Sequence, residues 1–236
     1  MMLLMVIVLC AGLVGAAPGK QPRDESLNHY MDLVMDNLQV IIMENGLDPV
    51  ALPNTSMGFS DVVLGVEWHG EASLYDGWLR GLATIHRSVD ADFIRNSEGR
   101  ILGIQTGLAI GDMEAHYVCL AKFMDLGPIV NVFVEVHGAD VYFEAVLDPV
   151  ECKFRAEVLE VTDLGKINVT IEDLGALGWI IASLIDFVMI FIGGFISNIV
   201  ETVIKDLTNS ALDNVDLGIL GVVLGCERPA LPHVPL

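Results

Sequence analysis

Residues 174–200 constrain this chain more than any other segment. They are almost wholly apolar, and Asp186 is the only formal charge among them. About 20 apolar residues are enough for a helix to cross a bilayer. This run, however, follows a long region of strand-like alternation, in a chain that begins with an export signal. It therefore needs a cover, and the candidates are the protein's own sheet, a bound lipid and a membrane.

Residues 1–17 read as a secretory signal peptide, although the usual basic start is missing. Residues 2–13 form the apolar core, and Val14-Gly15-Ala16 is a small-residue cleavage site, with Ala16 or Ala17 as the last residue removed. An uncleaved anchor is the alternative. The mature chain, residues 18–236, suits one large domain, and its proline-rich tail at 227–236 is expected to be loose. We therefore expect a secreted, extracellular protein.

The charge balance is strongly acidic. The chain has 32 acidic and 12 basic residues, a formal charge of −20, and 53% hydrophobic residues. Such a surface repels phosphate backbones and anionic headgroups, so nucleic acid and acidic membranes are poor partners. The high apolar content argues against disorder.

An amphipathic helix is predicted at residues 24–45. Asp24 or Ser26 can cap its start, and Asn45-Gly46 followed by Pro49 ends it. Its apolar residues recur at three- and four-residue steps and form one stripe, which we expect to pack on a sheet. The stripe contains Leu27, Tyr30, Met31, Val34, Met35, Leu38, Ile41 and Ile42.

From residue 58 to residue 172 the period changes to two. Residues 131–136 and 141–147 alternate on either side of His137-Gly138-Ala139-Asp140, which is a hairpin signal. Similar alternation predicts strands at 60–82, 84–94, 100–110, 114–124, 152–158 and 167–171. These strands predict a long antiparallel meander with one apolar and one wet face.

Three cysteines remain after Cys10 leaves with the signal, so one disulfide is expected in an oxidising compartment. Cys119 and Cys152 both lie on apolar strand faces, and a Cys119–Cys152 disulfide is the preferred pairing. Cys226 is then free or intermolecular. Sequons at Asn54 and Asn168 predict a glycoprotein, and Asn168 falls on the polar face of its strand.

The second helix is predicted at residues 176–210, with a bend at Gly193-Gly194, and a last strand at 217–225. A membrane span would place Asp186 near the bilayer centre, at a cost of about 2.5–3.5 kcal/mol. Residues 201–236 contain two basic and five acidic residues, which gives no positive-inside signal. A helix that is apolar on most sides instead suits a sheet that curls around it. We therefore predict an α+β fold.

This order of parts resembles the group 7 mite allergens and their arthropod relatives, and through them the tubular lipid-binding superfamily that includes bactericidal/permeability-increasing protein and the takeout and juvenile-hormone-binding proteins. The resemblance implies a long, highly curved antiparallel sheet rolled around an apolar C-terminal helix, with an N-terminal amphipathic helix alongside and an apolar cavity between them. It covers nearly the whole mature chain. It is carried by residues 45–49, 78–87, 89–92, 117–123, 130–136 and 173–177.

Signals of catalysis are missing from the sequence. There is no G-x-S-x-G, Walker loop or G-x-G-x-x-G, and the six histidines show no metal-ligand spacing. His69 and Glu71 can form an acid–base pair, but neighbours on one strand face are more often plain surface. Asp186 can contact a ligand headgroup, or it can be paired or face the mouth of the roll. We therefore expect no enzyme, no cofactor and no metal.

The predicted function is that of a secreted, non-enzymatic carrier of a fatty acid, lipid or terpenoid in an apolar channel. Burying each ligand CH₂ contributes about 0.8 kcal/mol, so few polar contacts are needed. The alternatives are a membrane-anchored ectodomain with residues 174–200 as its span, and a secreted recognition protein with a filled core. Stable membrane insertion is not expected. The candidate lining residues, for which core packing is an equal alternative, are Met31, Val34, Met35, Leu38, Trp179, Leu184, Phe187, Phe191 and Phe195.

Overall fold

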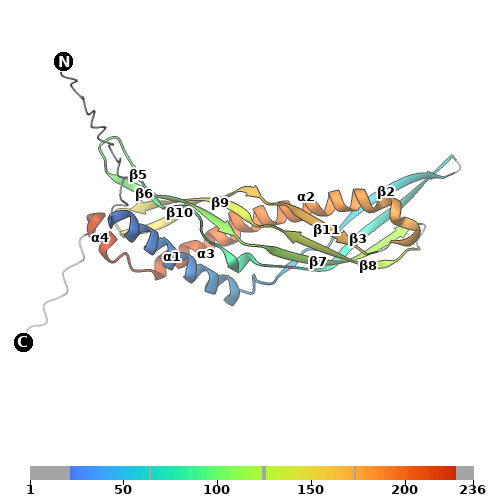
Figure 1. Cartoon of the computed structure of the whole chain (residues 1–236), viewed down its shortest axis with the longest axis horizontal. Coiled ribbons are helices and arrows are strands. Elements are labelled where there is room, and N and C mark those ends of the chain that lie inside the picture. The colour runs from blue at the N-terminus through green and yellow to red at the C-terminus, as the bar shows by residue number, and fades with distance from the viewer. Residues whose placement is uncertain (1–21, 64, 124–125, 173, 227–236) are drawn as a thin grey trace, which may run out of the picture.

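The computed structural model describes residues 22–63, 65–123, 126–172 and 174–226, so the predicted signal (1–17) and tail (227–236) lie outside the described residues. The molecule is elongated (Figure 1). Its helices are α1 (Pro22–Glu44), α2 (Ile181–Ile199), α3 (Lys205–Asn214) and α4 (Ile219–Val223), with 3₁₀ turns η1 (Leu82–Thr84) and η2 (Gly175–Ile180) and a π-helical turn η3 (Val200–Ile204). Its strands are β1 (Val50–Leu52), β2 (Thr55–Val63), β3 (Val66–Arg80), β4 (His86–Arg87), β5 (Asp92–Arg95), β6 (Ile101–Ile110), β7 (Met113–Phe123), β8 (Ile129–Val136), β9 (Ala139–Asp148), β10 (Lys153–Leu164) and β11 (Ile167–Ile171).

Two antiparallel sheets lie end to end along the molecule (Figure 1). The six-stranded sheet has the order β1-β3-β7-β8-β11, with β2 paired to β3, and the five-stranded sheet has the order β10-β9-β6-β4, with β5 paired to β6. The chain runs directly from β6 into β7, from β8 into β9 and from β10 into β11. Each of these pairs is therefore one long strand that leaves one sheet and joins the other.

A row of glycines marks the line where these strands change sheets. We call Gly81, Gly111, Gly138 and Gly165 the waist glycines. Hydrogen bonds connect members of the row: the Gly165 N–H donates to the Gly138 carbonyl over 3.0 Å, and the Gly111 N–H donates to Thr84 Oγ1 over 2.8 Å, while the Thr84 hydroxyl donates to the Gly81 carbonyl over 2.6 Å. A Cβ at Gly165 would overlap the His137 carbonyl oxygen, and Gly138 has a φ of +81°. Residues with side chains fit poorly at both points.

The hairpin predicted at residues 137–140 is wrong. β8 pairs with β7 and β11, whereas β9 pairs with β6 and β10, so these two strands do not pair with each other. Gly138 bends the chain sideways into the next sheet and does not reverse it. The sequence analysis missed a hairpin whose two strands join within the run 60–82: β2 pairs with β3 from Thr55↔Leu74 to Val63↔Val66.

α1 confirms the predicted amphipathic helix. Leu27, Met31, Val34, Leu38 and Ile42 are all buried. The helix ends as predicted after residue 44, because Gly46 (φ +67°) lets the Leu47 N–H donate to the Ile42 carbonyl over 3.1 Å, a Schellman-type ending. Beyond it, the Asp48 carboxylate accepts hydrogen bonds from the N–H groups of Gly81 and Ala83, at 2.9 and 2.8 Å. These bonds connect the end of α1 to η1.

The second helical stretch runs from residue 175 to residue 214 and differs from prediction in two details. Its irregular turn is the π-helical η3, and Gly193-Gly194 lies within regular α2. The stretch 217–225 is not a strand, because residues 219–223 form α4, whose Leu220 packs into the core.

The helices cover the two halves of the molecule unequally. α1 packs against α3, η1, β4 and α4, and α3 also packs on β10, so the five-stranded half is covered by two helices (Figure 1). α2 packs on β11 and β10. Together the sheets and helices form a curled antiparallel half-barrel around the long apolar helix.

Candidate functional site

One stripe of α2 is embedded in the sheet. Leu184, Val188, Ile192 and Ile196 recur every four residues, and their side chains are fully buried. This spacing places them on one face of the helix, toward the concave side of the sheet. The packing of this stripe is that of a core helix.

The opposite side of α2 is uncovered. Ile190 is 78% exposed and Trp179, just before α2, is 46% exposed, while Ala182, Asp186 and Gly194 are also exposed. We call these five residues the open face of α2. Only 28% of the most apolar 18-residue window of the helix is buried. Asp186 lies on this solvent side.

An aromatic cluster stands at the start of the helix. The Trp179 ring meets the Phe59 and Phe123 rings edge to face, with centroids 5.5 and 6.1 Å away, and Phe59 and Phe123 are 6.3 Å apart. Phe59 comes from β2 and Phe123 from β7. Edge-to-face pairs at such distances add to packing energy. Trp179 is thereby held in place although almost half of it is exposed.

Further along α2, Phe191 lies against Tyr117 and Phe187, at 6.1 and 6.3 Å between centroids. The Tyr117 hydroxyl donates to the Pro53 carbonyl over 2.8 Å, and burial raises the pKa of this phenol. Phe187, Phe191 and Phe195 are half-buried at the edge of the helix. They form an apolar border between the embedded stripe and the open face.

The nine predicted lining residues fall into two groups. Met31, Val34, Met35 and Leu38 on α1, together with Leu184 on α2, are fully buried in the core. Trp179, Phe187, Phe191 and Phe195 remain partly exposed along α2. The α1 group lies over the five-stranded half and the exposed α2 group over the other half. Phe59 and Phe123 were missed by sequence reasoning, and only their places in alternating strands pointed to this face.

The predicted Cys119–Cys152 disulfide is wrong. Cys152 is bonded to Cys226, with their Cα atoms 5.9 Å apart. Cys119 is a buried free thiol in β7, and burial raises its pKa to about 11. The two cysteines lie in different parts of the fold, since Cys119 is in β7 of the six-stranded sheet and Cys152 is in the turn before β10 of the five-stranded sheet. Their predicted positions on apolar strand faces therefore did not make them partners. Cys226 reaches Cys152 because α4 folds back onto the β9–β10 turn.

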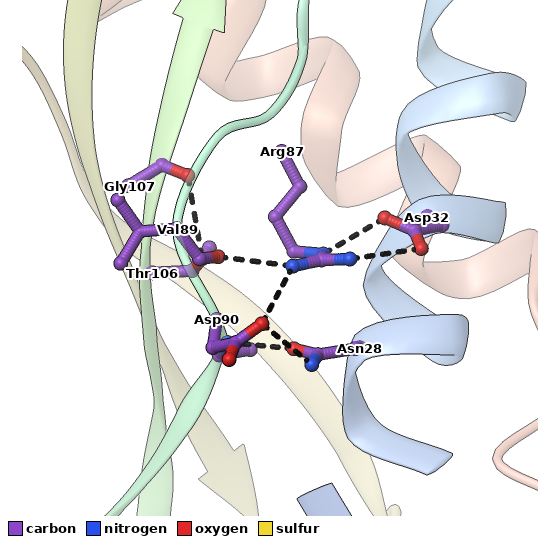
Figure 2. A network of polar contacts seen from close by, with 8 residues as sticks. Asn28, Asp32, Arg87, Val89, Asp90, Thr106 and Gly107 are labelled. Carbon is purple, nitrogen blue, oxygen red and sulfur yellow. Dashed lines mark hydrogen bonds and ion pairs between the residues drawn. The ribbon is translucent and has the colours of Figure 1, made fainter. Parts of the chain in front are cut away.

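A polar network fastens α1 to the segment between β4 and β6 (Figure 2). The Arg87 guanidinium donates to both Asp32 carboxylate oxygens, at 2.8 and 3.0 Å, and this hydrogen-bonded partner raises the pKa of Arg87. Asn28 donates to Asp90 over 3.0 Å and accepts from the Ala91 N–H over 2.7 Å. These side chains orient α1, and they make no contact with the open face in the described hydrogen bonds.

Other sequence candidates lie on the surface. His69 and Glu71 are exposed on β3, in agreement with the plain-surface interpretation. Asn54 is exposed between β1 and β2, whereas Asn168 is half-buried, with Nδ2 2.9 Å from His137 Nε2. Glycosylation at both sequons stays a prediction.

Length and composition alone would let one helix of the described chain, Gly175–Asn214, cross a membrane. A core helix of a soluble protein passes the same test. Length and composition do not record that one stripe of α2 is buried against the sheet.

The half-barrel, the embedded apolar helix and the flanking α1 define the class of tubular lipid-binding folds. The family model described as group 7 allergen matches residues 26–212, and the chain belongs to this family. This confirms the resemblance predicted from the sequence. Among curated proteins no match was found.

Among solved structures, the chain is similar to the crystal structure of a lipopolysaccharide-binding protein, with a TM-score of 0.54 and 15% sequence identity. The match covers 81% of this chain and 38% of the other, so this chain spans well under half of that protein's length. At this identity the similarity shows the fold alone.

Proposed function

We propose that this protein is a secreted, non-enzymatic carrier that holds a fatty acid, another lipid or a terpenoid against the open face of α2. The observation that carries the proposal is the unequal coverage of this helix, which is apolar enough to cross a membrane yet has only 28% of its most apolar window buried. Large exposed apolar surfaces mark sites that bind something.

Aromatic rings on the open face and along its border provide the contacts. Trp179, Phe187, Phe191 and Phe195 offer apolar surface to an extended chain, and each ligand CH₂ removed from water contributes about 0.8 kcal/mol. The buried candidates then serve as core: Leu184 lies beneath this surface, and the α1 residues Met31, Val34, Met35 and Leu38 lie in the five-stranded half. The fold and the family support a binding role, and the disulfide and the family support an extracellular location.

A brominated fatty acid tests this site, because bromine quenches tryptophan fluorescence only at short range. We expect saturable quenching in the wild type and its loss in Trp179→Phe. Trp78→Phe is the matched control, since Trp78 stacks on His116 with centroids 5.9 Å apart and is not part of the cluster around Trp179. This control should keep the quenching.

Native mass spectrometry of the secreted protein, with organic extraction of what co-purifies, complements the quenching experiment. A lipid of defined mass at near-stoichiometric amount supports the carrier. Soluble protein with no ligand and no fatty-acid uptake would replace it by the recognition role. Protein that leaves membranes only with detergent would favour the anchored alternative.

A further inference from the structure

Two adjoining hollows are lined by residues of β5, β6, β9 and the segment that ends at Cys226. The β5–β6 hairpin and α4 lie at the opposite end of the molecule from the β2–β3 hairpin (Figure 1). The first, which we call the end cleft, has a volume of about 470 Å³ and is lined by Ile94, Arg100, Ile101, Leu102, Gly103, Glu144, Val146, Leu147 and Pro149. The second, of about 400 Å³, shares Arg100, Ile101, Leu147 and Pro149 with it and continues to α4 and Cys226. Volumes of this size are typical of small-molecule sites.

The end cleft arises from the register of three strands. Gly103 on β6 pairs with Ile94 on β5 and with Val146 on β9. It leaves a gap between these two side chains, and a Cβ at this position would overlap the Ala145 carbonyl oxygen. The pairing of β5 with β6 also slips between Ile94 and Arg95. The hollow is therefore built into the backbone.

The lining is mostly apolar and open to solvent. Leu102 is 47% exposed and Val146 is 42% exposed, and Val150 in the neighbouring turn is 90% exposed. None of these side chains belongs to the open face of α2. The apolar surface continues past Pro149 into the second hollow.

The charged groups around the end cleft leave Arg100 available. Arg100 pairs only with Glu98 among the described ion pairs, over 3.2 Å, and both side chains are more than 70% exposed, so the pair is easily exchanged. Glu144 accepts from the Tyr142 hydroxyl over 3.0 Å, and Asp148 accepts from the N–H groups of Val150 and Glu151. Arg95, which lines the second hollow, donates to the Gly99 carbonyl.

We propose that the end cleft is a second binding site, for a single-chain amphiphile with a carboxylate head. The carboxylate replaces Glu98 on the Arg100 guanidinium, whose planar fork suits a bidentate carboxylate. The chain lies over Leu102 and Val146 and passes Pro149 toward α4. The site is independent of the proposed function, which uses the open face of α2.

Photo-crosslinking of the full-length secreted protein with a diazirine-bearing C16 fatty acid tests the proposal. Labelled peptides covering residues 94–103 and 144–149 are the expected result, alone or together with labels on α2. Labels confined to α2 would overturn this site and leave the proposed function standing. Absence of any label would overturn both the end cleft and the binding of a fatty acid to α2. Labelling of these peptides by a lysophospholipid but not by the fatty acid would overturn the assignment of a carboxylate head.

Variants separate the contribution of the ligand's carboxylate head to binding from that of its hydrocarbon chain. Arg100→Gln should weaken binding of the fatty acid to the end cleft about tenfold and leave its methyl ester unchanged, because only the acid uses the guanidinium. Glu98→Gln, the matched control, should keep or tighten binding of the acid. Val146→Trp fills the hollow from an exposed position and should abolish labelling by both ligands. Equal loss of acid and ester in Arg100→Gln would overturn the assigned role.

Discussion

Arg87 shows how a single side chain positions a whole helix. It lies in a strand of two residues, yet its side chain is only 17% exposed and its guanidinium donates to both carboxylate oxygens of Asp32 on α1 (Figure 2). A partly buried bidentate pair is worth more than the usual surface pair, because water competes less for it. Arg87 therefore contributes to the docking of α1 beyond the apolar stripe.

Arg87→Gln should lower the free energy of unfolding by about 1–2 kcal/mol, since the loss of a charged hydrogen bond is moderated by the half-exposed Asp32. Urea denaturation followed by circular dichroism measures this change. Arg80→Gln is the matched control: its pair with Glu114 is more than half exposed on both sides, so its effect should stay within about 0.5 kcal/mol. Equal effects of the two variants would show that the Arg87 network stabilises the fold no more than an exposed ion pair does.

The Asp213–Lys153 pair leads to a prediction about the free energy of unfolding at low pH. Hydrogen bonding to Lys153, over 2.9 Å, lowers the pKa of this carboxyl in the folded protein. The folded pKa lies below the unfolded value of about 3.9, so the stabilisation is complete above that value and is lost as pH falls through the folded pKa. Asp213→Asn should therefore flatten the fall in unfolding free energy below about pH 4. Parallel acid titrations of the two proteins, by circular dichroism in urea, check it, and curves of identical slope would contradict it.

At the scale of elements, the waist glycines lie where three long strands change sheets and where the chain leaves β3 for η1 and β4. Each long strand must cross from one sheet to the next beside its neighbours, and the crossing points lie next to one another. A Cβ at Gly81 would overlap the Asp112 carbonyl oxygen, and one at Gly165 would overlap the His137 carbonyl oxygen. Substitution at these two waist positions is therefore expected to be costly.

Gly165→Ala should destabilise the protein by at least about 1–3 kcal/mol, because its Cβ would overlap the His137 carbonyl oxygen. Gly194→Ala is the control of equal chemistry: nothing lies within 4 Å of its Cβ, and in a helix interior the change should stabilise by about 0.5–1 kcal/mol. Thermal unfolding of both variants measures the contrast. A tolerated Gly165→Ala would mean that the waist can relax.

At the scale of the whole molecule, the two halves differ in how completely helices cover their sheets. The five-stranded half is closed by α1 and α3 and is tied to the chain's end by the Cys152–Cys226 bond. The six-stranded half has α2 with an uncovered side. The proposed binding surface on α2 therefore belongs to the half that has an uncovered helix side, and the proposed end cleft lies near the disulfide in the other half.

The double variant Cys152→Ser/Cys226→Ser should lose up to about 4 kcal/mol of unfolding free energy, since the bond closes a loop with a sequence separation of 74 residues. Reductant should shift the urea midpoint of the wild type in the same direction and leave the double variant unchanged. A wild-type midpoint that does not respond to complete reduction would contradict this role.

Periodicity in the sequence determined the elements that depend on local physics. The stripe at residues 27–42 determined α1 and its buried face, and the alternating runs determined most strands, because burial against a sheet repeats every 3.6 or every two residues. The apolar run at 174–200 determined the long helix, and the order of these parts was enough to predict the family.

Only the tertiary structure decided the features that depend on distant partners. The alternation around Gly138 is the same for a hairpin and for a strand that changes sheets, and only the pairing of β8 and β9 with other strands separates them. The alternation around Cys119 and Cys152 placed both on apolar strand faces, but it recorded neither that Cys152 lies in the turn before β10 nor that Cys226 lies beside it. Likewise, an apolar helix has the same sequence whether its far side is covered or open. That difference depends on how far the sheet curls, which no local pattern in the sequence records.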